Sequence, residues 1–71
     1  MSLRKRSVTI AGHRTSVSLE DAFWDELARD ARRRGLSVNA LIAEIDDARE
    51  TNLSSAIRLY VLDAAKRGRS A

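Results

Sequence analysis

The side chains best suited to bind a ligand lie between Arg14 and Leu19, where polar and apolar residues alternate. In an extended strand, neighbouring side chains point to opposite faces, so Arg14, Ser16 and Ser18 share one face and the apolar residues share the other. The first face offers a guanidinium group and two hydroxyl groups, which donate and accept hydrogen bonds. The sequence therefore predicts a half-buried strand with a polar, cationic outer face.

A second cluster of cations stands near the start of the chain, at Arg4, Lys5 and Arg6. Residues 1–18 contain four Lys or Arg residues and no acid, although the net charge of the whole chain is only +3. Basic surface of this kind suits a polyanion such as nucleic acid, and the alternative is a solvated surface with a loose tail. We expect residues 1–12 to form a basic N-terminal arm.

Length and composition exclude several classes of protein. The chain has 71 residues, no cysteine and a single histidine, which leaves no disulfide, no thiolate metal site and no evident catalytic constellation. We therefore predict neither an enzyme nor a bound cofactor or metal. No apolar run approaches the ~20 residues of a membrane span, and the first residues lack the apolar core of a signal peptide. We expect a cytoplasmic protein with one small domain.

The strand at residues 14–19 needs a partner, because unpaired backbone groups cost free energy. No second strand with a buried face is evident in the sequence. The most economical partner is the same strand of a second copy, antiparallel about a two-fold axis. We therefore expect an obligate homodimer. With Ser16 at the axis, Arg14 of one strand faces Ser18 of the other.

Three helices are expected after the strand. The first covers residues 20–34, with acids in its first turns, arginines in its last turn and Gly35 to end it. Ser37 is the N-cap candidate of the second helix. Its apolar residues have the i, i+3, i+4, i+7 spacing of one buried face: Val38, Leu41, Ile42 and Ile45. Asn52 or Ser54 caps a third, strongly apolar helix that runs to about residue 67.

The order of these signals over residues 13–46 resembles the ribbon-helix-helix family of bacterial repressors, of the MetJ, Arc and CopG type. The resemblance is carried by the segments VSLEDAFW at residues 17–24 and GLSVNALI at residues 35–42. It implies a mostly α fold with one short β-strand, an intertwined homodimer and an intersubunit antiparallel β-ribbon. Residues 13–47 correspond to the ribbon-helix-helix core, and residues 48–71 form an additional C-terminal helix and tail.

The same resemblance implies a sequence-specific DNA-binding transcriptional regulator, a repressor, whose ribbon enters the major groove. It assigns base-facing positions to Arg14, Ser16 and Ser18, and phosphate-binding positions to Ser37, Val38 and Asn39. Both assignments are physically reasonable. The major groove admits a two-stranded ribbon and displays a distinct pattern for each base pair, and a helix N-terminus presents free N–H groups to an anion.

The arm is constrained by this docking mode. Residues 7–10 are β-prone, and Ala11-Gly12 could turn them back beside the main strand. Such hairpins in both subunits of a strand-paired dimer would give four strands spaced ~4.8 Å, or roughly 15 Å of backbone, against a groove ~12 Å wide. We therefore expect residues 1–12 to stay mobile until Arg4, Lys5 and Arg6 order on DNA.

Two other functions remain open. One is an antitoxin-type regulator that binds DNA and uses its C-terminal helix to bind a protein partner. The other is a dimeric protein-interaction module that binds no nucleic acid. An ordered hairpin in a wider sheet favours the interaction module.

Overall fold

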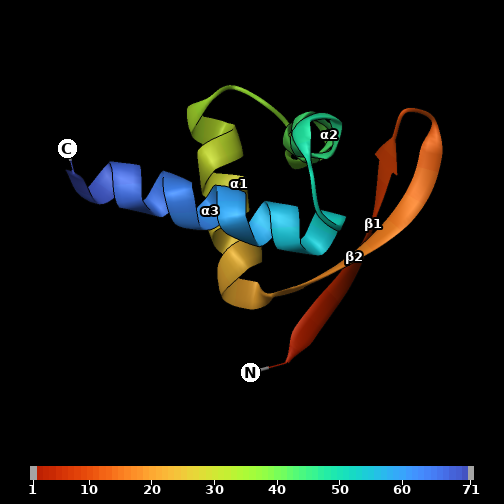
Figure 1. Ribbon diagram of the computed structural model, residues 1–71, viewed down its shortest axis with the longest axis horizontal. Helices are drawn as coiled ribbons and strands as arrows, with labels where there is room; N and C mark the ends of the chain where they lie inside the picture. The colour runs from red at the N-terminus through yellow and green to blue at the C-terminus, as the bar shows by residue number, and fades with distance from the viewer. Residues whose placement is uncertain (1, 71) are drawn as a thin grey trace.

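The computed structural model describes residues 2–70, and side chains up to residue 67. The chain forms two strands followed by three helices (Figure 1). Their bounds are β1 Leu3–Ile10, β2 His13–Glu20, α1 Asp21–Arg33, α2 Val38–Ala48 and α3 Leu53–Ser70.

The two strands form an antiparallel hairpin along their full length, from the pair Leu3 and Glu20 to the pair Ile10 and His13. Ala11 and Gly12 make the turn, with φ angles of 53° and 81°. Positive φ at both central residues is the geometry of the type I′ turn, whose twist matches that of the flanking strands. Gly12 adopts this conformation without strain.

The strand β1 corrects two predictions. The expectation of a single strand is wrong, and so is the expectation of a mobile arm, because residues 3–10 pair with β2 in full register. The sequence signal of β1 is weak because Val8 is its one fully buried apolar side chain, with 7% of its surface exposed. The backbone of β2 finds a partner within its own chain, so the unpaired strand no longer requires a second copy.

The helix boundaries agree with the sequence signals. Ser37 accepts a hydrogen bond from the backbone N–H of Ala40 at 3.0 Å, which caps α2 as predicted. Gly35 has a φ of 72°, and the N–H of Leu36 donates to the carbonyl of Ala31 at 2.8 Å. These two features belong to the C-terminal motif that closes α1. Of the two cap candidates for α3, Asn52 forms the cap, because its side-chain oxygen accepts a hydrogen bond from the backbone N–H of Ser55.

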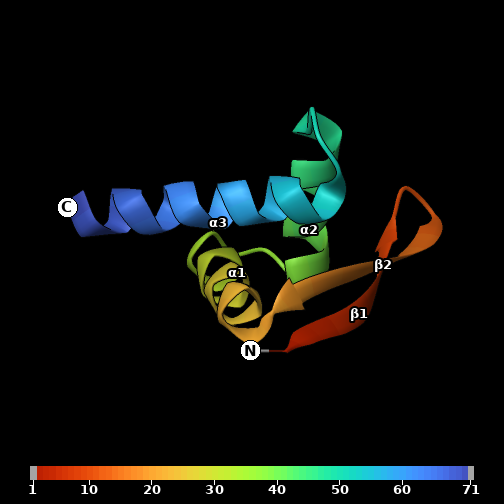
Figure 2. The ribbon, with the colours of Figure 1, turned by 60° about the horizontal axis from the view of Figure 1, so that its bottom comes forward.

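All three helices lie on one side of the hairpin, whose turn projects past them (Figure 2). The core between the layers draws on every element. Its buried members are Val8, Val17, Leu19, Trp24, Leu27, Ala31, Leu41, Ile42, Ile45, Ile57 and Val61. The third helix supplies two of them, so that a single chain encloses its own core. None of the described helices is both long and apolar enough to cross a membrane.

Candidate nucleic-acid interface

The outer face of the hairpin is polar and basic. Directly paired residues of two strands point to the same face, and the register pairs Lys5 with Ser18, Ser7 with Ser16 and Thr9 with Arg14. Five of these six side chains are exposed, and Ser18 is half-buried. Because the helices pack on the other face, these six side chains form one continuous surface without an acid, which we call the outer face. By the same alternation the pair Leu3 and Glu20 continues this face at its open end, where Glu20 is paired with Arg58 of α3.

The inner face of the hairpin carries the remaining cations of the N-terminal cluster. Arg4 pairs with Asp21 of α1, with 2.8 Å between Nε and Oδ1. Arg6 places its guanidinium 5.0 Å from the ring centre of Trp24. The indole N–H of Trp24 donates to the backbone carbonyl of Arg4 at 2.9 Å. Arg4 and Arg6 are thus engaged with α1, and Lys5 between them points the opposite way.

The two edges of the hairpin differ. At the edge of β1, Asn39 of α2 accepts from the N–H of Thr9 at 2.9 Å and donates to its carbonyl at 2.6 Å. One side-chain amide therefore pairs both backbone groups of an edge residue. At the other edge, no strand within residues 2–70 pairs with β2. By the alternation of an antiparallel ladder, the backbone groups of Arg14, Ser16 and Ser18 face this open edge.

The first turn of α2 lies beside β1 as a result of the contact between Asn39 and Thr9. The hydroxyl of Ser37 is occupied by the N–H of Ala40. The N–H groups of Val38 and Asn39 stand in the first turn, where a helix has no acceptor of its own. This places the three predicted phosphate-binding residues next to the outer face, with the Asn39 side chain engaged at the strand edge.

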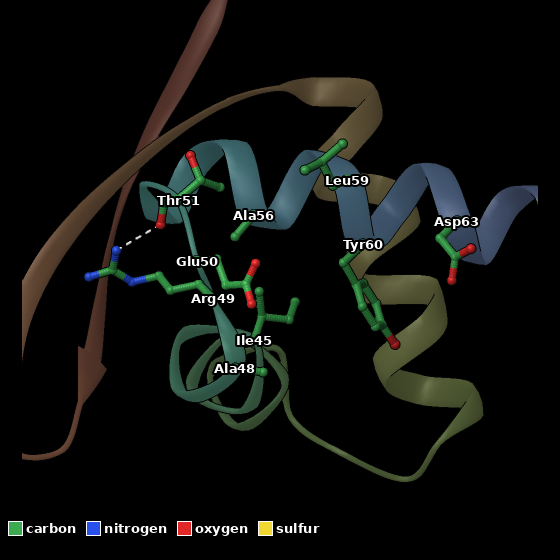
Figure 3. Close-up of a pocket in the computed structure, with 9 residues that line it drawn as sticks. All are labelled: Ile45, Ala48, Arg49, Glu50, Thr51, Ala56, Leu59, Tyr60 and Asp63. Carbon is green, nitrogen blue, oxygen red and sulfur yellow. Dashed lines mark hydrogen bonds between the residues drawn. The ribbon is translucent and has the colours of Figure 1, made fainter.

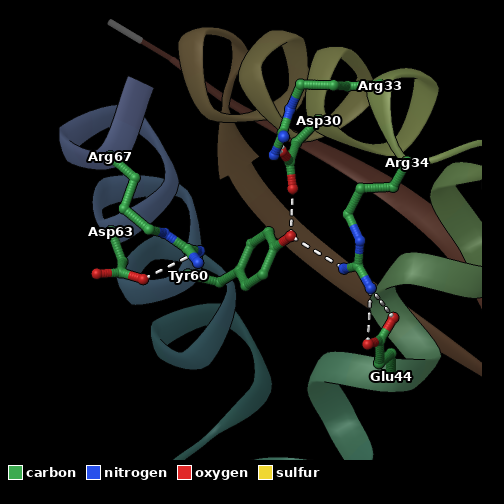
Figure 4. Close-up of polar contacts among 7 residues, drawn as sticks. All are labelled: Asp30, Arg33, Arg34, Glu44, Tyr60, Asp63 and Arg67. Carbon is green, nitrogen blue, oxygen red and sulfur yellow. Dashed lines mark hydrogen bonds and ion pairs between the residues drawn. The ribbon is translucent and has the colours of Figure 1, made fainter. Parts of the chain in front are cut away.

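A polar network joins the three helices on the far side of the core (Figure 4). The buried carboxylate of Asp30 accepts from the hydroxyl of Tyr60 and from Arg33. Arg34 donates to the Tyr60 hydroxyl at 3.1 Å and to both carboxylate oxygens of Glu44 at 2.9 and 3.1 Å. The network therefore ties α1 to α2 and α3.

The network shifts the ionisation of its members. Burial disfavours the charged form of Asp30, but the hydrogen bonds from Tyr60 and Arg33 outweigh it, so the pKa of Asp30 lies below its ordinary value. Burial and the hydrogen bond to Asp30 raise the pKa of Tyr60. Glu44 and Tyr60 raise the pKa of Arg34. Paired carboxylates and guanidinium groups of this kind fix helices relative to one another.

The hairpin contains one acid, Glu20 at the end of β2, and it is also paired. The Nε of Arg58 in α3 donates to Glu20 at 3.1 Å. A backbone hydrogen bond and this guanidinium lower the pKa of the Glu20 carboxyl. The single negative charge of the hairpin is thus matched by a helix residue, and the charged side chains of the outer face are the cations Lys5 and Arg14.

An open groove of about 420 Å³ lies between the end of α2 and α3 (Figure 3). Its lining is mixed, and Arg49 there donates to the carbonyl of Thr51 at 2.8 Å. Leu59 at its border is 61% exposed, and Leu62, one turn further along α3, is 51% exposed. Within residues 2–70 no group of three or more His, Cys, Asp or Glu side chains is placed to hold a metal ion.

Comparison with known families decides the identity of this fold. A family model described as a ribbon-helix-helix domain matches residues 3–65, which is most of the chain. The chain belongs to the ribbon-helix-helix family. Its members are typically DNA-binding transcription regulators, typically dimerise and are generally not enzymes. Searches of curated proteins and of solved structures return no match.

The match extends the ribbon-helix-helix region beyond residues 13–47, the core expected from the sequence. It includes β1 and most of α3. The three predicted base-facing residues Arg14, Ser16 and Ser18 share the outer face as expected. The predicted basic arm is divided between the two faces of the hairpin, and only Lys5 joins the outer face.

The outer face of this ribbon-helix-helix protein contains three side chains that the sequence analysis did not assign to it: Lys5, Ser7 and Thr9. The sequence does contain a signal for a strand at this place. Residues 7–10 alternate polar and apolar, and a glycine follows at residue 12. Their placement opposite β2 depends on the register, which the turn geometry fixes.

Proposed function

We propose that this protein is a sequence-specific DNA-binding transcription regulator, acting as a repressor, that places the outer face of the β1–β2 hairpin in the major groove. The observation that carries the proposal is the acid-free outer face, with cations and hydroxyl groups on one side and all helices on the other. Arginine and lysine can contact guanine, and hydroxyl groups can both donate to and accept from base edges.

The width of the hairpin supports this docking mode. Two strands separated by ~4.8 Å fit a groove ~12 Å wide, whereas four strands do not. The strand that pairs with β2 in this structure is β1 of the same chain. The presence of β1 therefore leaves the major-groove proposal intact, provided that β2 keeps its open edge when bound to DNA.

The first turn of α2 is proposed to contact a backbone phosphate. Its free N–H groups, at Val38 and Asn39, lie beside the hairpin edge because the Asn39 side chain holds the backbone of Thr9. A helix N-terminus favours an anion through these N–H groups and the helix dipole. Ser37 contributes by capping the helix, and its hydroxyl is already bonded to Ala40.

We propose that the regulator acts as a homodimer, as is typical of the family. Pairing two β2 edges would give a four-stranded sheet too wide for the groove. The exposed large apolar side chains of the described residues are Leu3, Leu59 and Leu62, and the last two lie one turn apart on α3, where they offer a contact between subunits. In sedimentation equilibrium at micromolar concentration, wild type should be a dimer and a Leu59→Ser, Leu62→Ser variant a monomer. A wild-type monomer would reject the dimer and leave DNA binding to be judged separately.

DNA binding is tested by titrating random-sequence and selected duplexes at two salt concentrations. Wild-type affinity should fall steeply with salt, because bound cations release counterions from the phosphates. Arg14→Ala should weaken specific binding by about 1–3 kcal/mol and relax the preferred sequence. The control is Arg29→Ala, which removes the same charge from the exposed side of α1 and should leave sequence preference unchanged. Absence of any salt-dependent affinity would favour the interaction module.

One observation favours a second candidate function, the antitoxin-type regulator. The groove between α2 and α3 is bordered by exposed leucine, which suits a protein partner. Such a partner should co-purify with wild type in fixed stoichiometry and be lost from a Leu59→Glu variant that still binds DNA. Retention by that variant would exclude the groove as the binding surface.

A further inference from the structure

We propose that the groove between the end of α2 and α3 binds a basic, amphipathic segment of a partner protein. Apolar side chains of that segment lie on the floor of the groove, and its Lys or Arg side chains meet the acids of the rim. The inference rests on the second candidate function, because it names the chemistry of the protein partner considered there. It does not depend on which strands contact DNA.

The floor of the groove is apolar and is supplied by two helices. Ile45 of α2 is 8% exposed, and Ala56 and Tyr60 of α3 are half-buried. In Figure 3 these three side chains point into the space between the helices. The groove is open along its length, which suits the apolar stripe of a helix laid into it.

The aromatic part of the floor is held in place before a partner arrives. The Tyr60 hydroxyl donates to Asp30 and accepts from Arg34 at 3.1 Å, so the ring cannot turn out of the groove without breaking the polar network. A surface that is already fixed loses little conformational freedom on binding. The floor therefore has the pre-formed character of a binding surface.

The rim of the groove is acidic, because its cation is occupied. Arg49, the cation among the described lining residues, binds Asp46 with 2.7 Å between Nε and Oδ1 and donates to the carbonyl of Thr51. In Figure 3 its side chain extends away from the floor, whereas the carboxylate of Glu50 lies beside Ile45. Glu50 is exposed and forms no ion pair with another described side chain. Its charge is therefore available to a partner.

A second acid stands at the other end of the groove. Asp63 is bound by Arg67 of the same helix at 3.1 Å, and 67% of its side chain is exposed. An ion pair this exposed contributes little, because water screens it. A cation of the partner can therefore take the place of Arg67. Acids at both ends of an apolar floor match a segment with cations on either side of its apolar residues.

Folding does not explain the acids at the end of α2. In α1 an acid stands in the first turn and arginines in the last, as the helix dipole favours. In α2 the last turn contains no base, and Asp46 and Asp47 stand near its C-terminus, which is already partly negative. Arg49 compensates Asp46, but Asp47 is exposed and has no ion pair among the described side chains. A cationic partner relieves this repulsion.

Titration of the isotope-labelled full chain with two synthetic helical peptides tests the inference. Both peptides have leucine at the i, i+3, i+4, i+7 positions of one face, and their other positions are lysine in one and glutamate in the other. The lysine peptide should bind saturably, shift the amide NMR signals of Ala48, Glu50 and Ala56, and bind less tightly at high salt. The glutamate peptide should bind at least about 10-fold more weakly.

Variants of one rim acid sharpen the test. Glu50→Lys should weaken binding of the lysine peptide by about 3- to 10-fold, because it replaces an attraction by a repulsion. Glu50→Asp should keep the wild-type affinity. The matched control is Asp25→Lys, which makes the same change of charge on α1, outside the groove, and should have less than about a 2-fold effect. Both positions are exposed, so these variants should fold.

Several results would overturn the inference. Equal binding of the two peptides, or equal effects of Glu50→Lys and Asp25→Lys, would show that the groove does not select a basic segment. Groove signals that shift on dilution of the protein alone would mean that a second copy covers the groove. A co-purifying partner that Glu50→Lys retains would reject the basic chemistry and leave the second candidate function standing. DNA titration is a separate readout, in which Glu50→Lys should keep the wild-type sequence preference.

Discussion

The inner and outer faces of the hairpin are built from neighbouring residues of the same strands, and they have opposite properties. On the inner face, Val17 and Leu19 are almost fully buried and Arg6 stacks on an indole ring. On the outer face, Lys5 and Arg14 are exposed and unpaired within the described residues. Alternation along a strand thus buries one face in the core and leaves the other, the face that we propose binds DNA, exposed to solvent. Substitutions at adjacent positions should then have separable effects.

The largest effect is expected at the buried end of β2. Leu19→Ala removes a side chain with no exposed surface from the core, which should lower the free energy of unfolding by about 2–5 kcal/mol. Ser18→Ala, one residue away on the outer face, should change it by no more than about 0.5 kcal/mol. Urea denaturation of both variants measures the contrast. Equal losses at the two positions would mean that the outer face is packed against something and is not a free surface.

The polar network of the helix layer gives the next largest effect. Tyr60→Phe removes the hydroxyl that donates to Asp30 and accepts from Arg34. Because one of these hydrogen bonds joins a charged acceptor, the loss should be about 1.5–3 kcal/mol near neutral pH. Arg14→Ala on the outer face serves as the matched control and should leave the free energy of unfolding nearly unchanged. The measurement is again urea denaturation of each variant.

The pH dependence of Tyr60→Phe has a defined sign. The pKa of Asp30 is lowered in the folded protein, so its ionised form contributes stability above the unfolded value of ~3.9. That contribution is lost as the pH falls below ~3.9 and through the folded pKa. Without the Tyr60 hydroxyl the pKa of Asp30 should be lowered less, so the gap between wild type and variant should narrow at acid pH. A gap that widens below pH 4 would contradict this assignment.

The helices could be predicted because their ends carry local signals. Ser37 and Gly35 act on residues three or four positions away, so that the sequence around them is enough to place the end of α1 and the start of α2. The shared face of Arg14, Ser16 and Ser18 also followed from strand period alone.

The first strand could not be predicted from local signals in the way that the helix ends could. Its turn uses Ala11 at a positive φ, where the usual type I′ signal is Asn-Gly or Asp-Gly. Its cations resemble a solvated tail, but they are strand residues that pair with β2, and Trp24, two elements later in α1, holds Arg6 over its ring and donates to the Arg4 carbonyl. The position of Lys5 on the outer face follows from these tertiary contacts, which no local pattern contains.

The smallest expected effect tests whether the cations of the basic cluster, Arg4, Lys5 and Arg6, are divided between the two faces of the hairpin. Arg6→Ala removes a guanidinium that lies 5.0 Å from the ring centre of Trp24, on an exposed part of the inner face. Cation–π contacts at exposed sites contribute about 0.5–1 kcal/mol, so the free energy of unfolding should fall by that amount. Lys5→Ala, which removes the same charge from the next position, should leave stability unchanged and weaken DNA binding instead.

Arg6→Ala and Lys5→Ala must be compared both in unfolding and in DNA binding, because a weaker binding alone could come from the lost charge. Loss of one positive charge weakens binding to any polyanion, so both variants should show a slightly smaller salt dependence. Only Lys5→Ala should also change the preferred sequence, because Arg6 faces α1 and Lys5 faces away from it. If Arg6→Ala changes base preference and leaves unfolding unaffected, β1 presents its opposite face to DNA. The assignment of the two faces would then be reversed for this strand.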